Sequence, residues 1–346
     1  MATITNRGQY QFQAKIRRKG YPIQIKTFTA KREAEAWARS IESEMDQGVF
    51  IPRAEAERTT LGAALERYLN EVTPLKKGCE QEERRIRAWL KHPLAKRSLA
   101  SLTSTDFAKY RDDRLKSVSA ASATRELALI SHLFTIAIKE WQLPLQNIIQ
   151  NIRKPKQEKG RERRLSPEEE AYLLQACQQS KASAIETIVR LAIETAMRRG
   201  EILGLRWQHI DLKKQTIFLP DTKNGDSRTV PLSSRAVGAL HAWPRSLDGR
   251  VFPQYHHQDS LKKAWGNAIK AAKNAYFAAC TEHKTHPDPS FLCDLRFHDL
   301  RHEATSRIAE KLPNVLELAA VTGHKNLQML KRYYHPKAEE LARKLG

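Results

Sequence analysis

One charged stretch of the sequence, residues 153–164 (RKPKQEKGRERR), separates parts of the chain that are expected to fold independently. Its only apolar side chain is that of Pro155, which is typical of an exposed linker. Apolar residues at helical spacing lie on both sides of it. Because a chain of 346 residues is also too long for one ordinary hydrophobic core, we expect two or three domains.

The net charge of the chain is +21 at pH 7, far more than solubility requires. A chain this basic is expected to bind a polyanion, and nucleic acid is the leading candidate. A membrane surface is the alternative. However, no apolar run approaches the ~18–20 residues that a transmembrane helix needs, and the N-terminus has no signal-peptide pattern. We therefore expect a cytoplasmic, nucleoid-associated protein that binds double-stranded DNA and no membrane.

The sequence points to no cofactor and no metal. The four cysteines are scattered without a CxxC pair and are expected to be reduced. A zinc site from Cys280, His283, His286 and Cys293 is an alternative, but this spacing fits no usual zinc module. The sequence also has no GxxxxGK[ST] loop and no acidic metal cluster.

Residues 1–52 predict a small α+β module. Residues 9–16 and 21–28 alternate polar and apolar side chains, as half-buried strands do. Thr29 is expected to cap a helix that ends near Gln47. A basic ribbon of two or three strands can read a DNA groove, although a merely solvated sheet face is the alternative. The candidate DNA-binding residues here are Lys15, Arg17, Arg18, Lys19 and Lys26.

Residues 59–152 predict a bundle of four to five helices. The longest, about Ala121–Trp141, carries a continuous apolar stripe, and Pro144 ends it. Basic residues on the polar faces make a DNA-facing surface plausible, although any single such charge is usually only solvated. The candidate DNA contacts are Lys76, Lys77 and Arg84 in the bundle and Arg153, Lys154 and Lys156 in the linker, which would follow the DNA backbone.

Residues 165–346 predict a third, mostly helical domain. Ser166, Pro167 and the following glutamates mark a helix start. Two strands, 215–219 and 228–232, flank an Asn-Gly turn that places Lys223 at a hairpin tip. The stretch at about 271–289 has no clear pattern. The expected fold class is therefore multidomain and mainly α, with a β-ribbon module, a helical bundle and a mixed α+β domain, separated by the linker.

Side chains suited to phosphate chemistry gather near the C-terminus. His298 and Arg301 are one helical turn apart and can share a helix face, and His324 and Tyr333 follow. His302 also lies one turn after His298. A two-histidine metal face is one interpretation, but no third ligand is evident. We expect His302 to have a helix-packing or phosphate-adjacent role.

These motifs, in this order, resemble the tyrosine recombinases, also called the phage integrase family. The resemblance rests on TAMRRGEILGLRW at Thr195–Trp207, the Lys223 hairpin, HDLRH at His298–His302 and TGHKNLQMLKRYYHP at Thr322–Pro336. The N-terminal ribbon looks like the arm-type DNA-binding domain of lambda-like integrases, and the bundle looks like the core-binding domain. The region from Thr60 to the start of the third domain also resembles recombinases that invert plasmid shufflons.

The resemblance implies roles for individual residues. Arg198 and Arg301 would bind the scissile phosphate, while Tyr333 would be the nucleophile. Ala196 stands where the family usually has Gly, Thr322 where Leu is commoner, and the adjacent Tyr334 makes the nucleophile locally ambiguous. The implied catalytic set is Arg198, Lys223, His298, Arg301, His324 and Tyr333, with Glu201 in support.

This set suits strand transfer through a 3′-phosphotyrosyl link. Two guanidiniums can hold the non-bridging oxygens bidentately. A phenol with an ordinary pKa near ~10 needs help in losing its proton, for which we expect His298 or His324. Lys223 suits the general acid for the leaving 5′-oxygen. Because the link keeps the bond energy, neither ATP nor metal would be required.

We expect an integrase or excisionase of a phage or mobile element. The resemblance implies four protomers on two DNA sites, with the C-terminal tail, about Pro336–Gly346, docked on a neighbour. Accessory DNA-bending proteins would be further partners. One alternative is DNA inversion of the shufflon type. Another is a non-catalytic DNA-binding regulator that keeps the fold, and a topoisomerase-like relaxing enzyme is a third.

Overall fold

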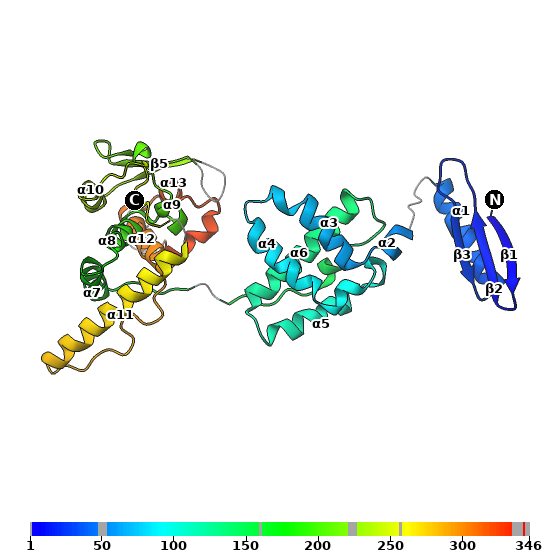
Figure 1. Cartoon of the computed structure of the whole chain (residues 1–346), viewed down its shortest axis with the longest axis horizontal. Coiled ribbons are helices and arrows are strands. Elements are labelled where there is room, and N and C mark those ends of the chain that lie inside the picture. Colours follow the sequence, from blue (N-terminus) through cyan, green and yellow to red (C-terminus); the bar gives the residue numbers. More distant parts are fainter. Residues whose placement is uncertain are drawn as a thin grey trace. The chain divides into compact units, whose positions relative to one another are not determined.

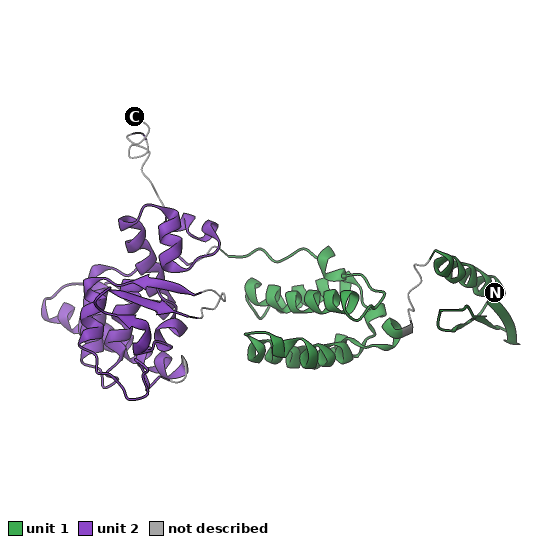
Figure 2. Cartoon of the chain, turned by 90° about the horizontal axis from the view of Figure 1, so that it is seen from above, with its two compact units in different colours: residues 1–159 green, residues 160–346 purple. Residues whose placement is uncertain are grey.

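The chain divides into two compact units, Met1–Lys159 and Gly160–Gly346 (Figures 1 and 2). The computed structural model describes residues 2–47, 54–158, 161–220, 227–255, 258–333 and 342. The expected fold class is confirmed, because helices dominate both units and the two sheets are small and three-stranded. Within the residues that the structure describes, none of the helices combines the length and apolar character needed to cross a bilayer.

A three-stranded antiparallel sheet opens the first unit, with strands β1 (Ala2–Gly8), β2 (Gln11–Ile16) and β3 (Gln24–Phe28) in that order. Helix α1 (Lys31–Asp46) covers one face, where its apolar side chains bury Ile16. The predicted helix cap at Thr29 is wrong. Residue Ala30 occupies the N-cap position without a side-chain hydrogen bond, because alanine has no polar side-chain atom.

The helical bundle of the first unit has a core of its own. Thr60 caps α3 by accepting a hydrogen bond from the Ala63 amide, and Tyr68, Trp89 and Phe134 are fully buried in the core. The α-helices are α2 (Ala54–Arg58), α3 (Leu61–Glu71), α4 (Cys79–Leu90), α5 (Ser104–Leu115) and α6 (Ala120–Lys139). Short 3-10 turns are η1 (Thr73–Leu75), η2 (Pro93–Lys96), η3 (Leu99–Ser101) and η4 (Ile148–Asn151).

The second unit is built around two pairs of packed helices. Helix α12 (Phe297–Lys311) packs on α8 (Ile185–Thr195), and α11 (Gln258–Glu282) packs on α7 (Pro167–Gln178) (Figure 1). The remaining helices are α9 (Arg199–Leu203), α10 (Ser234–His241) and α13 (Val315–Thr322), with 3-10 turns η5 (Trp207–His209), η6 (Leu327–Met329) and η7 (Lys331–Tyr333). The sheet comprises β4 (Ile210–Asp211), β5 (Thr216–Leu219) and β6 (Arg228–Pro231).

The segment without a clear pattern turns out to be helical for much of its length. Helix α11 runs to Glu282 because Trp265, Ala268, Ala272 and Tyr276 repeat at helical spacing and are buried. Strands β5 and β6 pair antiparallel as predicted. The residues between them, Lys223 and the Asn-Gly turn included, lie outside the described residues.

The last part of the predicted linker is docked on the second unit by ion pairs. Arg161, Arg163 and Arg164 form ion pairs with carboxylates of the second unit. The carboxylates are buried, and a buried carboxylate needs a cationic partner to remain charged. Asp299 lies 138 residues after Arg161, and Glu303 lies 139 residues after Arg164. No local sequence pattern could therefore reveal these two pairs.

Candidate active site

Arg301 lies at the centre of the second unit. It projects from α12, is buried, and donates from Nη2 to the Thr322 carbonyl at 2.7 Å and from Nη1 to the Ala196 carbonyl. These carbonyls belong to the C-terminal ends of α13 and α8, where unpaired carbonyls carry partial negative charge. Burial lowers the pKa of Arg301 to about 10, and nearby Arg198 adds to this effect. Two helix ends therefore hold a buried cation in place.

Glu201 lies between two further arginines. Its carboxylate accepts from Arg198 Nη1 at 2.7 Å, from the Arg198 amide at 2.8 Å, and from Arg228 through two bonds of 2.8 and 3.0 Å. Burial alone would raise the pKa of Glu201, but the bonds from Arg228 and Arg198 hold it below the usual range. Arg198 also donates to the Gly323 carbonyl at 3.2 Å. The base of the hairpin is thus joined to α9 and to the end of α13.

Three histidines surround Arg301. The rings of His298 and His302 meet edge to face, with centroids 5.1 Å apart. His324 contacts the Thr322 hydroxyl at 2.7 Å through Nδ1, and its Nε2 lies 3.5 Å from Arg301 Nη2. Burial, reinforced by nearby positive charge, lowers the pKa of His302 and of His324 to about 4 and also lowers that of His298. All three rings are therefore neutral at pH 7.

Tyr333 reaches the site from η7. Its hydroxyl is hydrogen-bonded to His302 Nδ1, and the two rings are nearly parallel, at 25° and 6.0 Å between centroids. Burial raises the pKa of Tyr333, so the phenol is protonated at neutral pH. The sequence predicts that His298 or His324 assists this hydroxyl, but its partner in the structure is His302.

The structure brings together five of the six residues in the predicted catalytic set. Arg198, His298, Arg301, His324 and Tyr333 converge with Glu201, while Lys223 and Tyr334 lie outside the described residues. Two features of the site were not predicted. The sequence singles out His302, one turn after His298, for a helix-packing or phosphate-adjacent role, but it does not predict the contact of His302 with Tyr333. The second feature is Arg228. No comparable signal in the sequence marks Arg228, whose side chain is 9% exposed and points from β6 to Glu201.

No metal centre accompanies this site in the described part of the chain, where no three His, Cys, Asp or Glu side chains are grouped to bind an ion. Cys280 is buried and Cys293 is exposed.

The predicted DNA contacts occupy different environments. Lys15 lies on the sheet face opposite α1, because its neighbours Ala14 and Ile16 are buried against that helix. Arg18 is paired with Asp46, and Lys76 pairs with Glu82 at 2.8 Å. Lys26 lies over the Phe28 ring at 5.7 Å. Arg18 and Lys26 are exposed despite these contacts, as are Arg17, Lys19, Lys77, Arg84, Arg153, Lys154 and Lys156.

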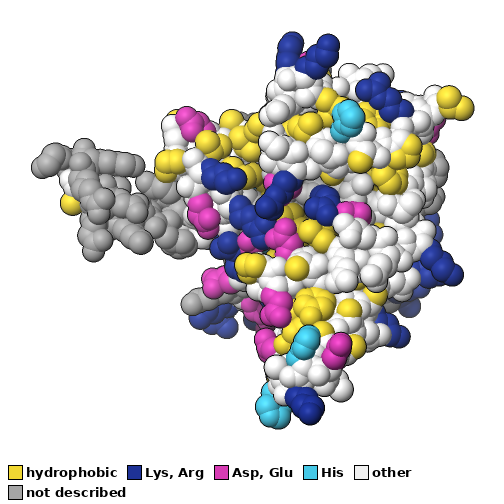
Figure 3. Space-filling view, turned by 90° about the vertical axis from the view of Figure 1, so that its left-hand side faces the viewer, with side chains coloured by type: hydrophobic (Ala, Val, Ile, Leu, Met, Phe, Trp, Pro, Cys, Tyr) yellow, Lys and Arg dark blue, Asp and Glu magenta, His cyan; other side chains and the backbone are white. Residues whose placement is uncertain are grey.

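The face drawn in Figure 3 is not a continuous cationic surface. Lysine and arginine side chains lie beside aspartate and glutamate side chains across its middle (Figure 3). Much of the positive charge on this face therefore lies next to negative charge. At physiological ionic strength, exposed charges interact over only about 8 Å.

A sequence model of the phage integrase family matches residues 163–340, which is more than half of the chain and contains every residue of the site. The chain belongs to the phage integrase family. This membership confirms the predicted enzyme class, a tyrosine-type site-specific DNA recombinase.

Curated relatives of the recombinase include both integrases and a shufflon-specific recombinase. A shufflon-specific DNA recombinase of Escherichia coli is 40% identical and covers 85% of this chain and 74% of its own length. A putative integrase/recombinase of Haemophilus influenzae is 33% identical, covering 98% of this chain and 89% of its own. The integrase of Salmonella phage P22 is 25% identical, with 88% and 81% covered.

Solved structures of low sequence identity share the fold of the recombinase. A Tn1549 transposon integrase in complex with transposon right end DNA has a TM-score of 0.63 at 17% identity, covering 83% of this chain and 98% of that one. A lambda integrase dimer bound to a core site has a TM-score of 0.60 at 20% identity, covering 96% and 94%. The lambda integrase tetramer bound to a Holliday junction also scores 0.60 at 20% identity, covering 93% and 95%.

Proposed function

We propose that this recombinase cleaves and rejoins duplex DNA at specific sites through a 3′-phosphotyrosyl link on Tyr333. The observation that carries the proposal is the position of the Tyr333 hydroxyl, which contacts His302 beside Arg301 and His324. A nucleophile, a proton acceptor and a buried guanidinium therefore lie within one site, as phosphoryl transfer requires.

The scissile phosphate would bind between Arg198 and Arg301. Both guanidiniums are held before DNA arrives, Arg198 by Glu201 and Arg301 by the two helix-end carbonyls. Preorganised donors of this kind stabilise the charge that spreads over the non-bridging oxygens in the transition state. His298 and His324 would complete the phosphate site as neutral hydrogen-bonding groups.

Cleavage would form one bond and break another at the same phosphorus. The Tyr333 oxygen would attack in line, its proton would pass to His302 Nδ1, and the bond to the 5′-oxygen would break. Lys223 would protonate that oxygen. The low pKa of His302, about 4, leaves the ring neutral and able to accept, and an incoming phosphate anion would raise this pKa. Attack of a 5′-hydroxyl on the link would reverse these steps.

The outcome we propose is integration and excision of a phage or mobile element, which the similarity to integrases supports. DNA inversion is the second candidate, and the 40% identity to a shufflon-specific recombinase favours it. The same chemistry serves both, because the relative orientation of two sites decides between excision and inversion. The intact site argues against a non-catalytic regulator.

On DNA, we propose an assembly of four protomers within the bacterial nucleoid, by analogy with the lambda integrase tetramer on a Holliday junction. The free face of the N-terminal sheet would contact a second class of DNA site. Because cross-strand partners share a face, this face carries Lys15, its neighbours in register Thr3 and Ile25, and the set Gln13, Thr5 and Thr27. Accessory DNA-bending proteins would assist such an assembly.

The experiment that tests the proposal maps the cleaved phosphates on the DNA that flanks the gene. Wild-type protein should become covalently attached to a 3′-phosphate at two or more related sites. A plasmid carrying those sites in direct or inverted orientation then separates excision from inversion. If no covalent adduct forms on any flanking segment, the protein is a non-catalytic DNA-binding regulator.

A further inference from the structure

Arg161 joins two parts of the second unit that are far apart in sequence. Its guanidinium donates to both carboxylate oxygens of Asp299, at 3.2 and 2.9 Å, and to Asp294 at 2.5 Å. Asp299 lies on α12 between His298 and Arg301, and is 2% exposed. The backbone carbonyl of Arg161 accepts a hydrogen bond from the side chain of Arg332, the residue that precedes Tyr333. Arg161 therefore contacts both α12, which carries Arg301, and the segment that ends at Tyr333, residues 327–333, which we call the tyrosine segment.

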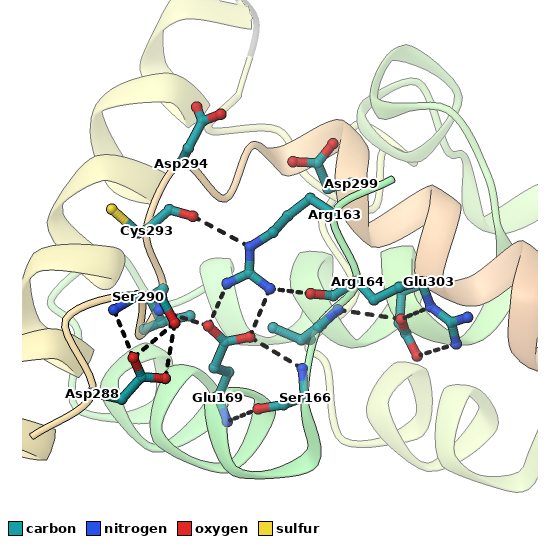
Figure 4. Close-up of polar contacts among 12 residues, drawn as sticks. Arg163, Arg164, Ser166, Glu169, Asp288, Ser290, Cys293, Asp294, Asp299 and Glu303 are labelled. Carbon is teal, nitrogen blue, oxygen red and sulfur yellow. Dashed lines mark hydrogen bonds and ion pairs between the residues drawn. The ribbon is translucent and has the colours of Figure 1, made fainter. Parts of the chain in front are cut away.

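Neighbouring arginines fix this segment, residues 161–164, which we call the arginine strap. Arg163 pairs with Glu169 and donates to the Cys293 carbonyl at 3.2 Å, while Arg164 pairs with Glu303 of α12 at 2.6 Å (Figure 4). Glu169 and Glu303 are 5% and 3% exposed. Removing the partner of a buried carboxylate is strongly unfavourable, so the strap is firmly docked.

The contacts close into a ring around the nucleophile. From the strap, the side chain of Arg332 leads to Tyr333, since its guanidinium lies 5.4 Å from the centre of the tyrosine ring. Tyr333 contacts His302 on α12, and α12 returns to Arg161 through Asp299. The tyrosine segment consists of short 3-10 turns with few buried residues, so its own packing fixes it weakly.

We propose that Arg161 and Arg332 are positioning residues for the nucleophile, and that docking of the arginine strap holds the Tyr333 hydroxyl against His302. This inference rests on the proposed function of Tyr333.

The test compares Arg161→Ala, Arg332→Ala and the double variant with Arg307→Ala. Arg307 of α12 is a matched control because, like Arg161, it pairs with two carboxylates, here Glu170 and Glu303, and one of the two lies on α12. The first readout needs no DNA. Nitration of Tyr333 by tetranitromethane, located by peptide mass spectrometry, should be several-fold faster in Arg161→Ala and Arg332→Ala than in wild type or Arg307→Ala.

The second readout is the single-turnover rate of covalent adduct formation on a nicked duplex that carries the mapped site. Arg161→Ala and Arg332→Ala should each slow it by about tenfold or more, since small misplacements of a reacting group are costly. DNA affinity should be unchanged. The double variant should be no slower than the slower single variant, because both changes act on one connection. Arg332→Ala removes the donor to the Arg161 carbonyl, and Arg161→Ala releases that carbonyl from its anchor on Asp299. Arg161→Lys should recover part of the rate.

Two results would overturn the inference. One is that Tyr333 nitration and cleavage proceed in both single variants at the same rates as in wild-type protein. The other is an equal loss in Arg307→Ala, which would show a general effect of weakened packing. If Arg161→Ala fails to fold, the exposed side chain of Arg332 still allows the test. If wild-type protein forms no adduct at all, the proposed function is refuted. The nitration rates still show whether Arg161 and Arg332 hold Tyr333 in place, because that measurement needs no DNA.

Discussion

The hydroxyl of Tyr333 is hydrogen-bonded to Nδ1 of His302, thirty-one residues earlier in the chain. A neutral imidazole in contact with a protonated phenol can take its proton as the phenol attacks. The same ring meets His298 edge to face, and His298 lies beside the two arginines proposed to hold the phosphate. The contact therefore ties the nucleophile to the phosphate site through one face of α12.

Tyr333→Phe is expected to abolish the covalent adduct while leaving DNA binding intact, because only the attacking oxygen is removed. Tyr334→Phe is the matched control and should retain adduct formation. The measurement is trapping of protein on a nicked duplex, followed by denaturing electrophoresis. Loss of trapping in Tyr334→Phe alone would mean that the nucleophile is Tyr334.

His302→Asn is expected to slow adduct formation about 100-fold or more, the range of a positioned general base. The amide oxygen of Asn can accept a hydrogen bond from Tyr333 but cannot take up a proton. His241→Asn, at an exposed position in α10, is the control and should keep the wild-type rate. A rate for His302→Asn within twofold of wild type would exclude a role in proton transfer.

A 5′-bridging phosphorothiolate substrate separates the two proton transfers, because a thiolate leaves without a proton. This substrate should restore cleavage by Lys223→Ala, as expected for a variant that lacks the general acid. It should not restore cleavage by His302→Asn. Restoration of both variants would place His302 on the leaving-group side of the reaction.

Gly323→Ala is expected to destabilise the second unit by about 1–3 kcal/mol. Its φ of +69° is unfavourable for alanine, and a Cβ atom would lie 2.6 Å from Arg228 Nη1. The free energy of unfolding from urea denaturation measures the effect. Gly266→Ala in α11 is the control, because nothing lies within 4 Å of its new Cβ, and it should stabilise by about 0.5–1 kcal/mol. Equal effects of the two changes would contradict the crowding argument.

Ala196→Gly is expected to stabilise the protein slightly, by up to about 1 kcal/mol. Ala196 has a φ of +52°, in the left-handed region that glycine adopts without strain. The carbonyl that Arg301 needs is retained, so cleavage should be unaffected. Ala192→Gly, inside α8, is the control and should destabilise by about 1 kcal/mol. A destabilised Ala196→Gly would show that the alanine methyl group contributes more through packing than it costs in strain.

The stability of the second unit is expected to fall as the pH drops from about 6.5 toward 4. His302 and His324 have a folded-state pKa of about 4, whereas unfolded histidine has a pKa near ~6.5. In this window the unfolded chain binds more protons, so acid favours unfolding. Urea midpoints at pH 7, 6 and 5 measure the slope. The double variant His302→Gln and His324→Gln should show a shallower slope, and an unchanged slope would contradict the assignment.

Local sequence patterns determined where several helices and strands of this protein begin and end. The Ser166 cap with Glu169 predicted the start of α7, the turn and strand patterns predicted β5 and β6, and the helical spacing of His298 and Arg301 placed them on one helix. Each of these signals acts within a few residues of the chain, where hydrogen bonds and helical periodicity operate directly. Family motifs extended the prediction to the set of converging residues.

Only the tertiary structure decided which of these side chains meet. His302 rather than His298 or His324 contacts Tyr333, Arg228 shares Glu201 with Arg198, and Arg161 binds Asp299 across 138 positions of sequence. Such pairs depend on how whole helices pack, and many arginines along the chain were equally suitable candidates for each carboxylate. The buried carboxylates select their partners by distance and geometry, which exist only after the core has formed.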